Sequence, residues 1–172
     1  EWTAHWIGSN LVGGPRSTIP APYLRKSFAI PETIRTARLY VTALGIYECS
    51  INGQPISQDV FNPGWTDYRK RIQYKVYDVA HMLADGHTLT ITTDRTWKYQ
   101  MGPLMESDLQ MGEAYDARRE MPDWDKSGFD DQRWQPVEVF DNMGMALVAT
   151  NGPTVRRIEE LKPVGTPTNK SN

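Results

Sequence analysis

With 172 residues, the chain has the length of a single domain and can bury a sizeable core. Nineteen Lys and Arg residues against 21 Asp and Glu residues give a net charge of −2, which provides no basic surface for nucleic acid and nothing that favours a membrane. No apolar run approaches the ~20 residues of a membrane-spanning helix, so we expect a soluble protein.

The first half of the chain contains the clearest strand signals. Alternating or apolar runs predict strands at 23–30, 38–42, 46–51 and 71–77. The dipeptide Asn52-Gly53 follows the third run and predicts a tight hairpin, because a type I′ turn needs two residues that tolerate positive φ. The single cysteine, Cys49, excludes an internal disulfide and a cysteine-based zinc site, and we expect it to be a small buried side chain.

The second half of the chain predicts shorter elements. Apolar residues at helical spacing indicate one or two helical turns over 78–83, with Asp78 as the N-cap. Residues 101–123 read as a long irregular stretch. Further strands are expected at 87–94, 137–140, 145–149 and 155–161, and one helical turn at 129–134 that places Trp134 against the core. The sum is an all-β chain of about eight or nine strands, arranged as a β-sandwich.

The loop at 61–68 is the first candidate for recognition. Trp65, Asp67 and Tyr68 combine an aromatic ring with hydrogen-bonding groups, which suits a sugar, because the apolar face of a pyranose lies flat on a ring. The alternative is structural: Trp65 closes the end of the sandwich and Asp67 caps the turn before the next strand. The basic run 69–71 is expected to be a solvated strand edge.

The second candidate is the acidic stretch around 108–118. Asp108, Glu113 and Asp116 are carboxylates of the kind that bind calcium or flank a glycosidic bond. The alternative is a buried network in which Glu113, Asp116 and Arg118 satisfy one another and fix the loop. No EF-hand pattern is present, and the three histidines show no metal-ligand spacing.

A series of ordered motifs carries a family resemblance. They are Trp6-Ile-Gly, Ala21-Pro-Tyr-Leu-Arg-Lys-Ser-Phe28, Tyr40-Val-Thr-Ala-Leu-Gly-Ile-Tyr-Glu48, Pro63-Gly-Trp-Thr-Asp-Tyr68, Gly112-Glu-Ala-Tyr-Asp-Ala-Arg118 and Glu159-Glu-Leu-Lys-Pro-Val164. Over roughly residues 2–164, the chain resembles the N-terminal domain of bacterial α-L-rhamnosidases of glycoside hydrolase family 78.

The resemblance implies a fold and a role. The fold is a jelly-roll β-sandwich of the galactose-binding type, which precedes a further β-sandwich and an (α/α) barrel that holds the catalytic carboxylates. The parent enzyme is expected to release terminal α-L-rhamnose with inversion. Residues 1–164 would then be a non-catalytic accessory domain that supports the barrel and contacts the sugar, and residues 165–172 a linker or disordered tail. The compartment, bacterial cytoplasm or secreted or periplasmic, depends on residues ahead of Glu1.

The resemblance also extends the site predictions. Related jelly rolls in some family members bind terminal rhamnose through calcium, so a calcium-dependent, lectin-like module is the second hypothesis. A third is a protein-interaction domain with an apolar patch at Met101, Leu104, Met105, Leu109 and Met111. The predicted sugar contacts are Trp65, Asp67, Tyr68, Glu113, Tyr115 and Arg118, and the predicted calcium ligands are Asp108 and Asp116.

The chain departs from the family pattern at one place. Family members usually continue from the Tyr77-Asp-Val79 region into further strands before the Thr-rich segment. Here Leu83 joins directly to Ala84, as though tens of residues were missing.

Overall fold

The computed structural model describes residues 2–11, 18–30, 36–83, 91–108, 110–141, 144–162 and 164–165. Over these residues the chain is nearly all β, with fourteen strands and two short 3-10 helices, which confirms the predicted all-β class. The strands pair into small sheets of two or three members, and the jelly-roll order stays a prediction. The elements are β1 (Trp6–Gly8), β2 (Pro22–Arg25), β3 (Arg38–Val41), β4 (Ser50–Ile51), β5 (Gln54–Pro55), β6 (Asp59–Val60), β7 (Arg71–Asp78), η1 (Ala80–Met82), β8 (Lys98–Met101), β9 (Leu104–Asp108), β10 (Gly112–Tyr115), η2 (Ala117–Arg119), β11 (Gln135–Pro136), β12 (Glu138–Phe140), β13 (Ala146–Ala149) and β14 (Val155–Arg156).

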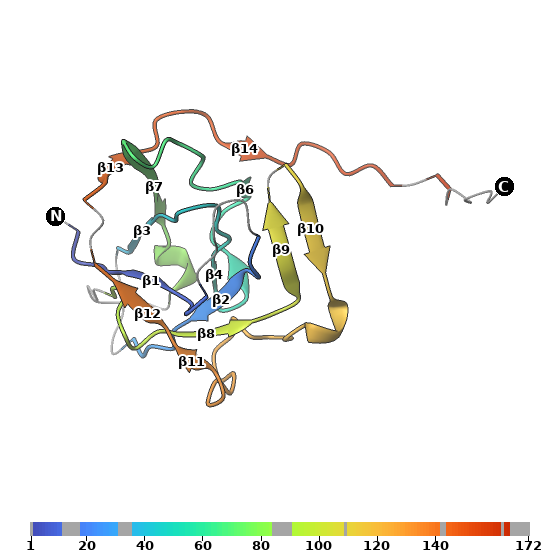
Figure 1. Ribbon diagram of the computed structural model, residues 1–172, viewed down its shortest axis with the longest axis horizontal. Coiled ribbons are helices and arrows are strands. Elements are labelled where there is room, and N and C mark those ends of the chain that lie inside the picture. The colour runs from blue at the N-terminus through green and yellow to red at the C-terminus, as the bar shows by residue number, and fades with distance from the viewer. Residues whose placement is uncertain are drawn as a thin grey trace.

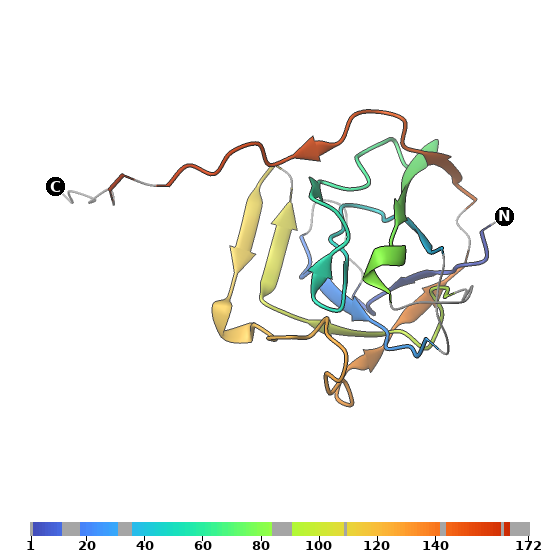
Figure 2. The same cartoon turned by 180° about the vertical axis from the view of Figure 1, so that it is seen from behind.

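Two three-stranded sheets form the body of the molecule. One has the order β13-β7-β3 and the other the order β11-β8-β2. The hairpin of β9 and β10 stands on the opposite side of the body from β13 and β7, and the C-terminal segment after β14 extends away beyond that hairpin (Figure 1). The view from behind shows the same extended segment (Figure 2).

The longest strand, β7, is central in its sheet and confirms the strand predicted at 71–77. It pairs antiparallel with β3 and parallel with β13, with Ile72 opposite Leu147. Ile72 is completely buried, whereas Val76, on the same face of the strand, is 45% exposed. One face of β7 is therefore buried in the core at Ile72 and partly exposed to solvent at Val76.

The Asn52-Gly53 hairpin is confirmed. Asn52 has a φ of 51° and Gly53 a φ of 77°, so both turn residues adopt the left-handed conformation that this turn requires. The turn joins β4 to β5, with Ser50 opposite Pro55. The strand predicted over 46–51 is shorter than expected, because only Tyr47, in an isolated bridge with Asn62, precedes β4.

The predicted helical turns at 78–83 are present as the 3-10 helix η1, with a different cap. The N-cap residue is Val79, which makes no side-chain cap bond. The Asp78 carboxylate nevertheless accepts a hydrogen bond of 3.1 Å from the Ala80 N–H. Of the strand predicted at 87–94, residues 87–90 lie outside the described residues, and 91–94 are not in a strand.

Two expectations for the second half are wrong. The stretch 101–123 is not irregular, since β9 and β10 form an antiparallel hairpin with Glu113 opposite Ser107. Propensity missed it because Glu, Asp, Gly and Ala are depleted in strands. The last predicted strand, 155–161, is reduced to Val155 and Arg156, which are the residues that reach β6. Strands are found near 137–140 and 145–149, as predicted.

A buried cation organises the core around β2 and β8. Arg25 is 7% exposed, and its guanidinium forms an ion pair with Asp131 and lies over the rings of Phe129 and Trp134. Lys98 Nζ approaches the other oxygen of the same carboxylate at 2.6 Å. The helical turn predicted at 129–134 is not a helix: the chain forms a hydrogen-bonded turn in which the Trp134 N–H donates to the Asp131 carbonyl at 3.0 Å. Trp134 is buried against the core, as predicted.

The charge of Asp131 predicts a pH dependence. Burial raises the pKa of this carboxyl, but Lys98 and Arg25 together outweigh burial and hold the pKa below its ordinary value. The ionised form therefore stabilises the fold above the unfolded-state pKa near 3.8, and this contribution is lost as the pH falls through the lower folded-state pKa. We expect the stability difference between the wild type and Asp131→Asn to narrow as the pH falls from about 5 towards 3, measured by urea unfolding. A constant difference over that range would contradict the assignment.

Candidate functional site

The loop that carries Trp65 is fixed at its base. Asn62 and Pro63 are buried, and the peptide bond between them is cis. The Asn62 carbonyl accepts a hydrogen bond of 2.8 Å from the Tyr47 N–H, and its side chain donates one of 3.1 Å to the Asp59 carbonyl. Gly64, with a φ of 100°, then turns the chain outward.

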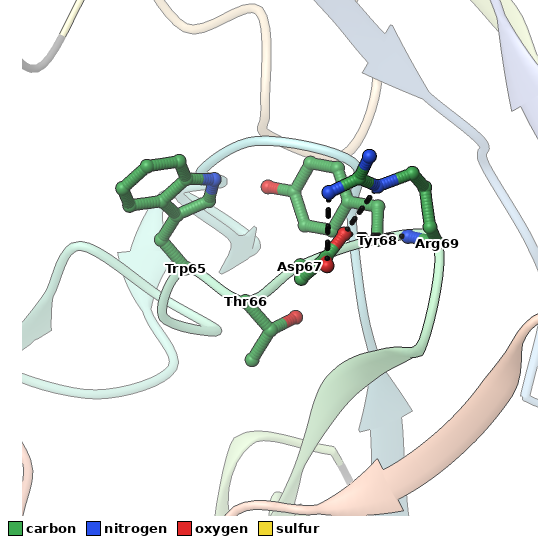
Figure 3. Close-up of a pocket in the computed structure, with 5 residues that line it drawn as sticks. All are labelled: Trp65, Thr66, Asp67, Tyr68 and Arg69. Carbon is green, nitrogen blue, oxygen red and sulfur yellow. Dashed lines mark hydrogen bonds and ion pairs between the residues drawn. The ribbon is translucent and has the colours of Figure 1, made fainter.

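Beyond this base, Trp65 to Arg69 line an open hollow of about 590 Å³. Trp65 is 77% exposed, so its ring presents apolar surface to solvent. The hydroxyl of Tyr68 points toward the side of the hollow on which Trp65 lies, and the Asp67–Arg69 pair lies beyond it (Figure 3). The structural alternative for Trp65, closing the end of a sandwich, is wrong because the side chain is not buried.

Asp67 and Arg69 supply paired charges beside the ring. Arg69 Nε lies 2.9 Å from one oxygen of the Asp67 carboxylate, and its terminal nitrogen lies 3.2 Å from the other. This side-chain hydrogen bonding holds the pKa of Asp67 below its ordinary value, so the carboxylate is ionised at neutral pH. Asp67 also caps the turn, as predicted, because its side chain accepts from the Arg69 N–H and its carbonyl accepts from Lys70 and Arg71.

Tyr68 is held from behind by the neighbouring loop. Its hydroxyl oxygen accepts a hydrogen bond of 2.9 Å from the Gly45 N–H. The hydroxyl proton is left to donate outward. The hollow thus combines an exposed ring, a hydroxyl donor, a carboxylate acceptor and a guanidinium, which is a set that can bind a polyol.

The role of Arg69 in the hollow was not predicted from the sequence. The basic run 69–71 was expected to be a solvated edge, and all three of its residues are exposed. Arg69 is also bound to Asp67 and lines the hollow. The signal available in the sequence was the Asp-x-Arg spacing, which recurs at Asp116 and Arg118 with the same two-pronged geometry.

The second predicted group lies on the β9–β10 hairpin and the helix that follows it. Asp108 accepts hydrogen bonds of 2.8 Å from the N–H groups of Gln110 and Met111, and these lower its pKa. Asp116 is the N-cap of η2 and forms an ion pair with Arg118, which lowers the pKa of this carboxyl. Each carboxylate is therefore used to shape its own turn.

The hairpin separates the two predicted calcium ligands. Asp108 lies opposite Gly112 at the turn end of the hairpin, whereas Asp116 follows the far end of β10. Four residues of extended chain correspond to about 13 Å, which is too long for two carboxylates to share one ion without rearrangement. Within the described ranges, no three Asp, Glu, His or Cys side chains are grouped so that they could hold a metal.

The remaining predicted residues of this group are exposed. Tyr115 donates a hydrogen bond of 2.9 Å to Glu120, and Glu113 is exposed on β10. The buried network of Glu113, Asp116 and Arg118 is therefore wrong, because the Arg118 side chain is 89% exposed and Glu113 is not part of the pair. None of these residues is among those that line the Trp65 hollow.

The apolar patch expected for an interaction domain is only partly exposed. Met111 is 86% exposed, whereas Met101, Leu104 and Met105 are half-buried. The fifth residue of that prediction, Leu109, lies outside the described residues.

Comparisons with known proteins assign the family. A family model described as the α-L-rhamnosidase N-terminal domain matches residues 32–88 and 80–159. The chain belongs to this family. An α-L-rhamnosidase of Streptomyces avermitilis is 32% identical and aligns with 93% of this chain and 20% of its own length.

Solved α-L-rhamnosidases share the fold. The native enzyme of Aspergillus terreus superimposes with a TM-score of 0.84 at 28% identity, covering 91% of this chain and 23% of the enzyme. The Streptomyces avermitilis enzyme complexed with L-rhamnose superimposes with a TM-score of 0.74 at 33% identity, covering 81% of this chain and 18% of the enzyme. This chain therefore spans about a fifth of the length of the relatives it matches.

The alignment with the Streptomyces avermitilis relative also indicates that this rhamnosidase domain is shorter than its relative. The alignment with the Streptomyces avermitilis relative spans 209 positions, yet 93% of 172 residues is about 160. About 50 positions of that alignment therefore have no residue in this chain. The two family-model matches meet at 80–88, around the join of Leu83 and Ala84. The join itself lies outside the described residues at Ala84.

None of the helices in the described part of the chain has the length and apolar character that crossing a bilayer requires.

Proposed function

We propose that this chain is the non-catalytic N-terminal module of an α-L-rhamnosidase, which supports a catalytic (α/α) barrel in the same parent chain. The parent enzyme would hydrolyse terminal α-L-rhamnose from glycosides with inversion. The observation that carries the proposal is the family match, together with the fact that the chain spans about a fifth of the length of its relatives. The test is an assay of aryl α-L-rhamnoside hydrolysis by the isolated chain. We expect no hydrolysis.

The carboxylates of the described residues support a non-catalytic role. A glycosidase needs a general acid with a raised pKa facing a second carboxyl across the bond. The pKa is held below its ordinary value at five carboxyls, which are Asp67, Asp94, Asp108, Asp116 and Asp131. Each of these groups is ionised at neutral pH and bound to donors within its own turn or core, so it is not poised to donate a proton.

The Trp65 hollow supports a sugar contact. An exposed indole ring offers a stacking surface, and Tyr68, Asp67 and Arg69 offer a donor, an acceptor and a cation beside it. A pyranose such as L-rhamnose presents one apolar face and several hydroxyls, which this set complements. Calcium is not needed for that contact, whereas a calcium-dependent site at Asp108 and Asp116 would require the hairpin to rearrange.

Calorimetric titration of the purified chain with L-rhamnose tests the contact. We expect Trp65→Ala to weaken binding about tenfold or more, because a lost stacking surface of about 1.4 kcal/mol corresponds to that factor. Trp2→Ala is the matched control, since Trp2 is a partly exposed tryptophan that packs on Tyr40 and Tyr74, outside the hollow. Binding should persist in a chelator.

The other outcomes separate the alternatives. Binding that a chelator abolishes and that Asp108→Asn or Asp116→Asn weakens would replace this site with the calcium-dependent one. If titration with L-rhamnose gives no heat of binding, either with or without calcium, the sugar contact is excluded. Only the supporting role would then remain.

A further inference from the structure

The C-terminal segment is attached to the body by a short anchor. Val155 and Arg156 of β14 pair with Val60 and Asp59 of β6. Arg156 Nε lies 3.0 Å from the Asp59 carboxylate, whose side chain is only 9% exposed. This anchor fixes the point at which the chain leaves the body.

After the anchor the chain makes no further hydrogen bond or ion pair with the rest of the described residues. Residues 157–162 are exposed throughout and belong to neither a helix nor a strand. Figures 1 and 2 show this segment extending well away from the body.

The apolar residues of the segment recur every third position. Val155 is 53% exposed, Ile158 98% and Leu161 80%, and Val164 is fully exposed. A β-strand would turn these side chains alternately to opposite faces. A polyproline II helix, with three residues per turn, aligns the three that follow β14, Ile158, Leu161 and Val164, on one edge. Pro163 favours this extended conformation because it disfavours the α region for Lys162.

The positions between the apolar residues are nearly all charged. After β14 they are Arg157, Glu159, Glu160 and Lys162. In the polyproline II arrangement these residues occupy the other two edges, so the segment has one apolar edge and two polar ones. An apolar edge of this regularity in solvent marks a contact surface.

We propose that residues 157–164, which follow the β14 anchor, form a docking strip in polyproline II conformation, whose apolar edge lies in an apolar groove of the domain that follows in the parent enzyme. The following domain is the expected occupant because the chain matches an N-terminal domain family and spans only about a fifth of the length of its relatives. The inference rests on the proposed function, since it requires a longer parent chain.

Limited trypsin digestion of the full-length parent enzyme tests the strip, with the Arg157–Ile158 bond as the probe. We expect cleavage of this bond to be at least about tenfold slower in the parent than in the 172-residue chain, because cleavage requires the docked strip to open. Leu161→Ser combined with Val164→Ser should bring cleavage in the parent within about twofold of the isolated chain. These substitutions leave the residues on both sides of the cut bond unchanged.

The charged edge provides the matched control. Glu160→Ser combined with Lys162→Ser should keep the protection of the wild-type parent. Equal cleavage of the wild type and the Leu161→Ser/Val164→Ser variant would overturn the proposal, as would equal loss of protection in the two variants. Protection that grows with concentration in the 172-residue chain would also overturn it, because the occupant would then be a second copy.

Activity separates this inference from the proposed function. Turnover of an aryl α-L-rhamnoside is measured on the same preparations. An inactive parent whose strip is protected through Leu161 and Val164 would contradict the rhamnosidase assignment and support the docking strip.

Discussion

Asp131→Asn is expected to lower the free energy of unfolding by about 3–5 kcal/mol, the usual cost of leaving a buried charge without its partner. Asparagine keeps the shape of the side chain and removes its charge. The guanidinium of Arg25, which is 7% exposed, would then have only neutral acceptors, namely the Phe129 and Lys126 carbonyls and the Ser27 hydroxyl. Urea unfolding measures the change.

Two further variants test whether the loss of stability is caused by the buried Arg25 charge that Asp131→Asn leaves unpaired. Arg25→Met combined with Asp131→Leu should destabilise less than Asp131→Asn alone, because it removes both charges and fills the space with apolar groups. Asp67→Asn breaks an exposed pair of the same chemistry, since the Arg69 side chain is 90% exposed, and should leave stability unchanged within error. A loss below about 1 kcal/mol for Asp131→Asn would show that this cluster does not hold the core.

Ile72→Ala is expected to cost about 2–5 kcal/mol, because a fully buried aliphatic side chain is removed from the middle of the central strand. Ile72 is 0% exposed and lies opposite Leu147 in the parallel pairing of β7 with β13. In a chain of this length the change corresponds to a fall in melting temperature of about 5–15 °C.

Val76→Ala is the control for Ile72→Ala, on the same strand and the same face. Val76 is 45% exposed, so its truncation should change stability by no more than about 0.5 kcal/mol. Equal losses of stability in the two variants would mean that Val76 is buried in solution, which would contradict the packing described for β7.

The parts of the fold that were predicted correctly rest on local signals. The Asn52-Gly53 turn needs only two residues that tolerate positive φ, and the alternating sequence at 71–77 predicted β7, which spans Arg71–Asp78. The β9–β10 hairpin was missed because its residues have low strand propensity, and its pairing is a property of the two segments together. The segment after Arg156 was predicted as strand from its apolar content, although its period is three rather than two.

The candidate site shows the same division. Trp65, Asp67 and Tyr68 lie together because they are neighbours in the chain, and the structure adds Arg69 through a bond within the same turn. Arg25 and Asp131 are 106 positions apart, so no local pattern connects them. Asp108, Glu113, Asp116 and Arg118 were chosen as members of an acidic stretch, and with Tyr115 they also occupy a family motif. Their part in binding stays a prediction.

This domain is shorter than the region of the Streptomyces avermitilis relative that it matches. About 50 aligned positions of the Streptomyces avermitilis relative have no counterpart here, and the family model is matched in two overlapping pieces around that point. The chain nonetheless superimposes on that enzyme over 81% of its length with a TM-score of 0.74. The described part of the chain therefore has the same fold as that region of the enzyme.

Incubation of the purified 172-residue chain with an aryl α-L-rhamnoside tests the central claim, that this domain is an accessory module without catalytic residues. We expect no release of the aryl group above the level of the Glu113→Gln variant, while a full-length parent enzyme turns the substrate over. Turnover by the isolated chain that Glu113→Gln abolishes would instead place the chemistry in this domain.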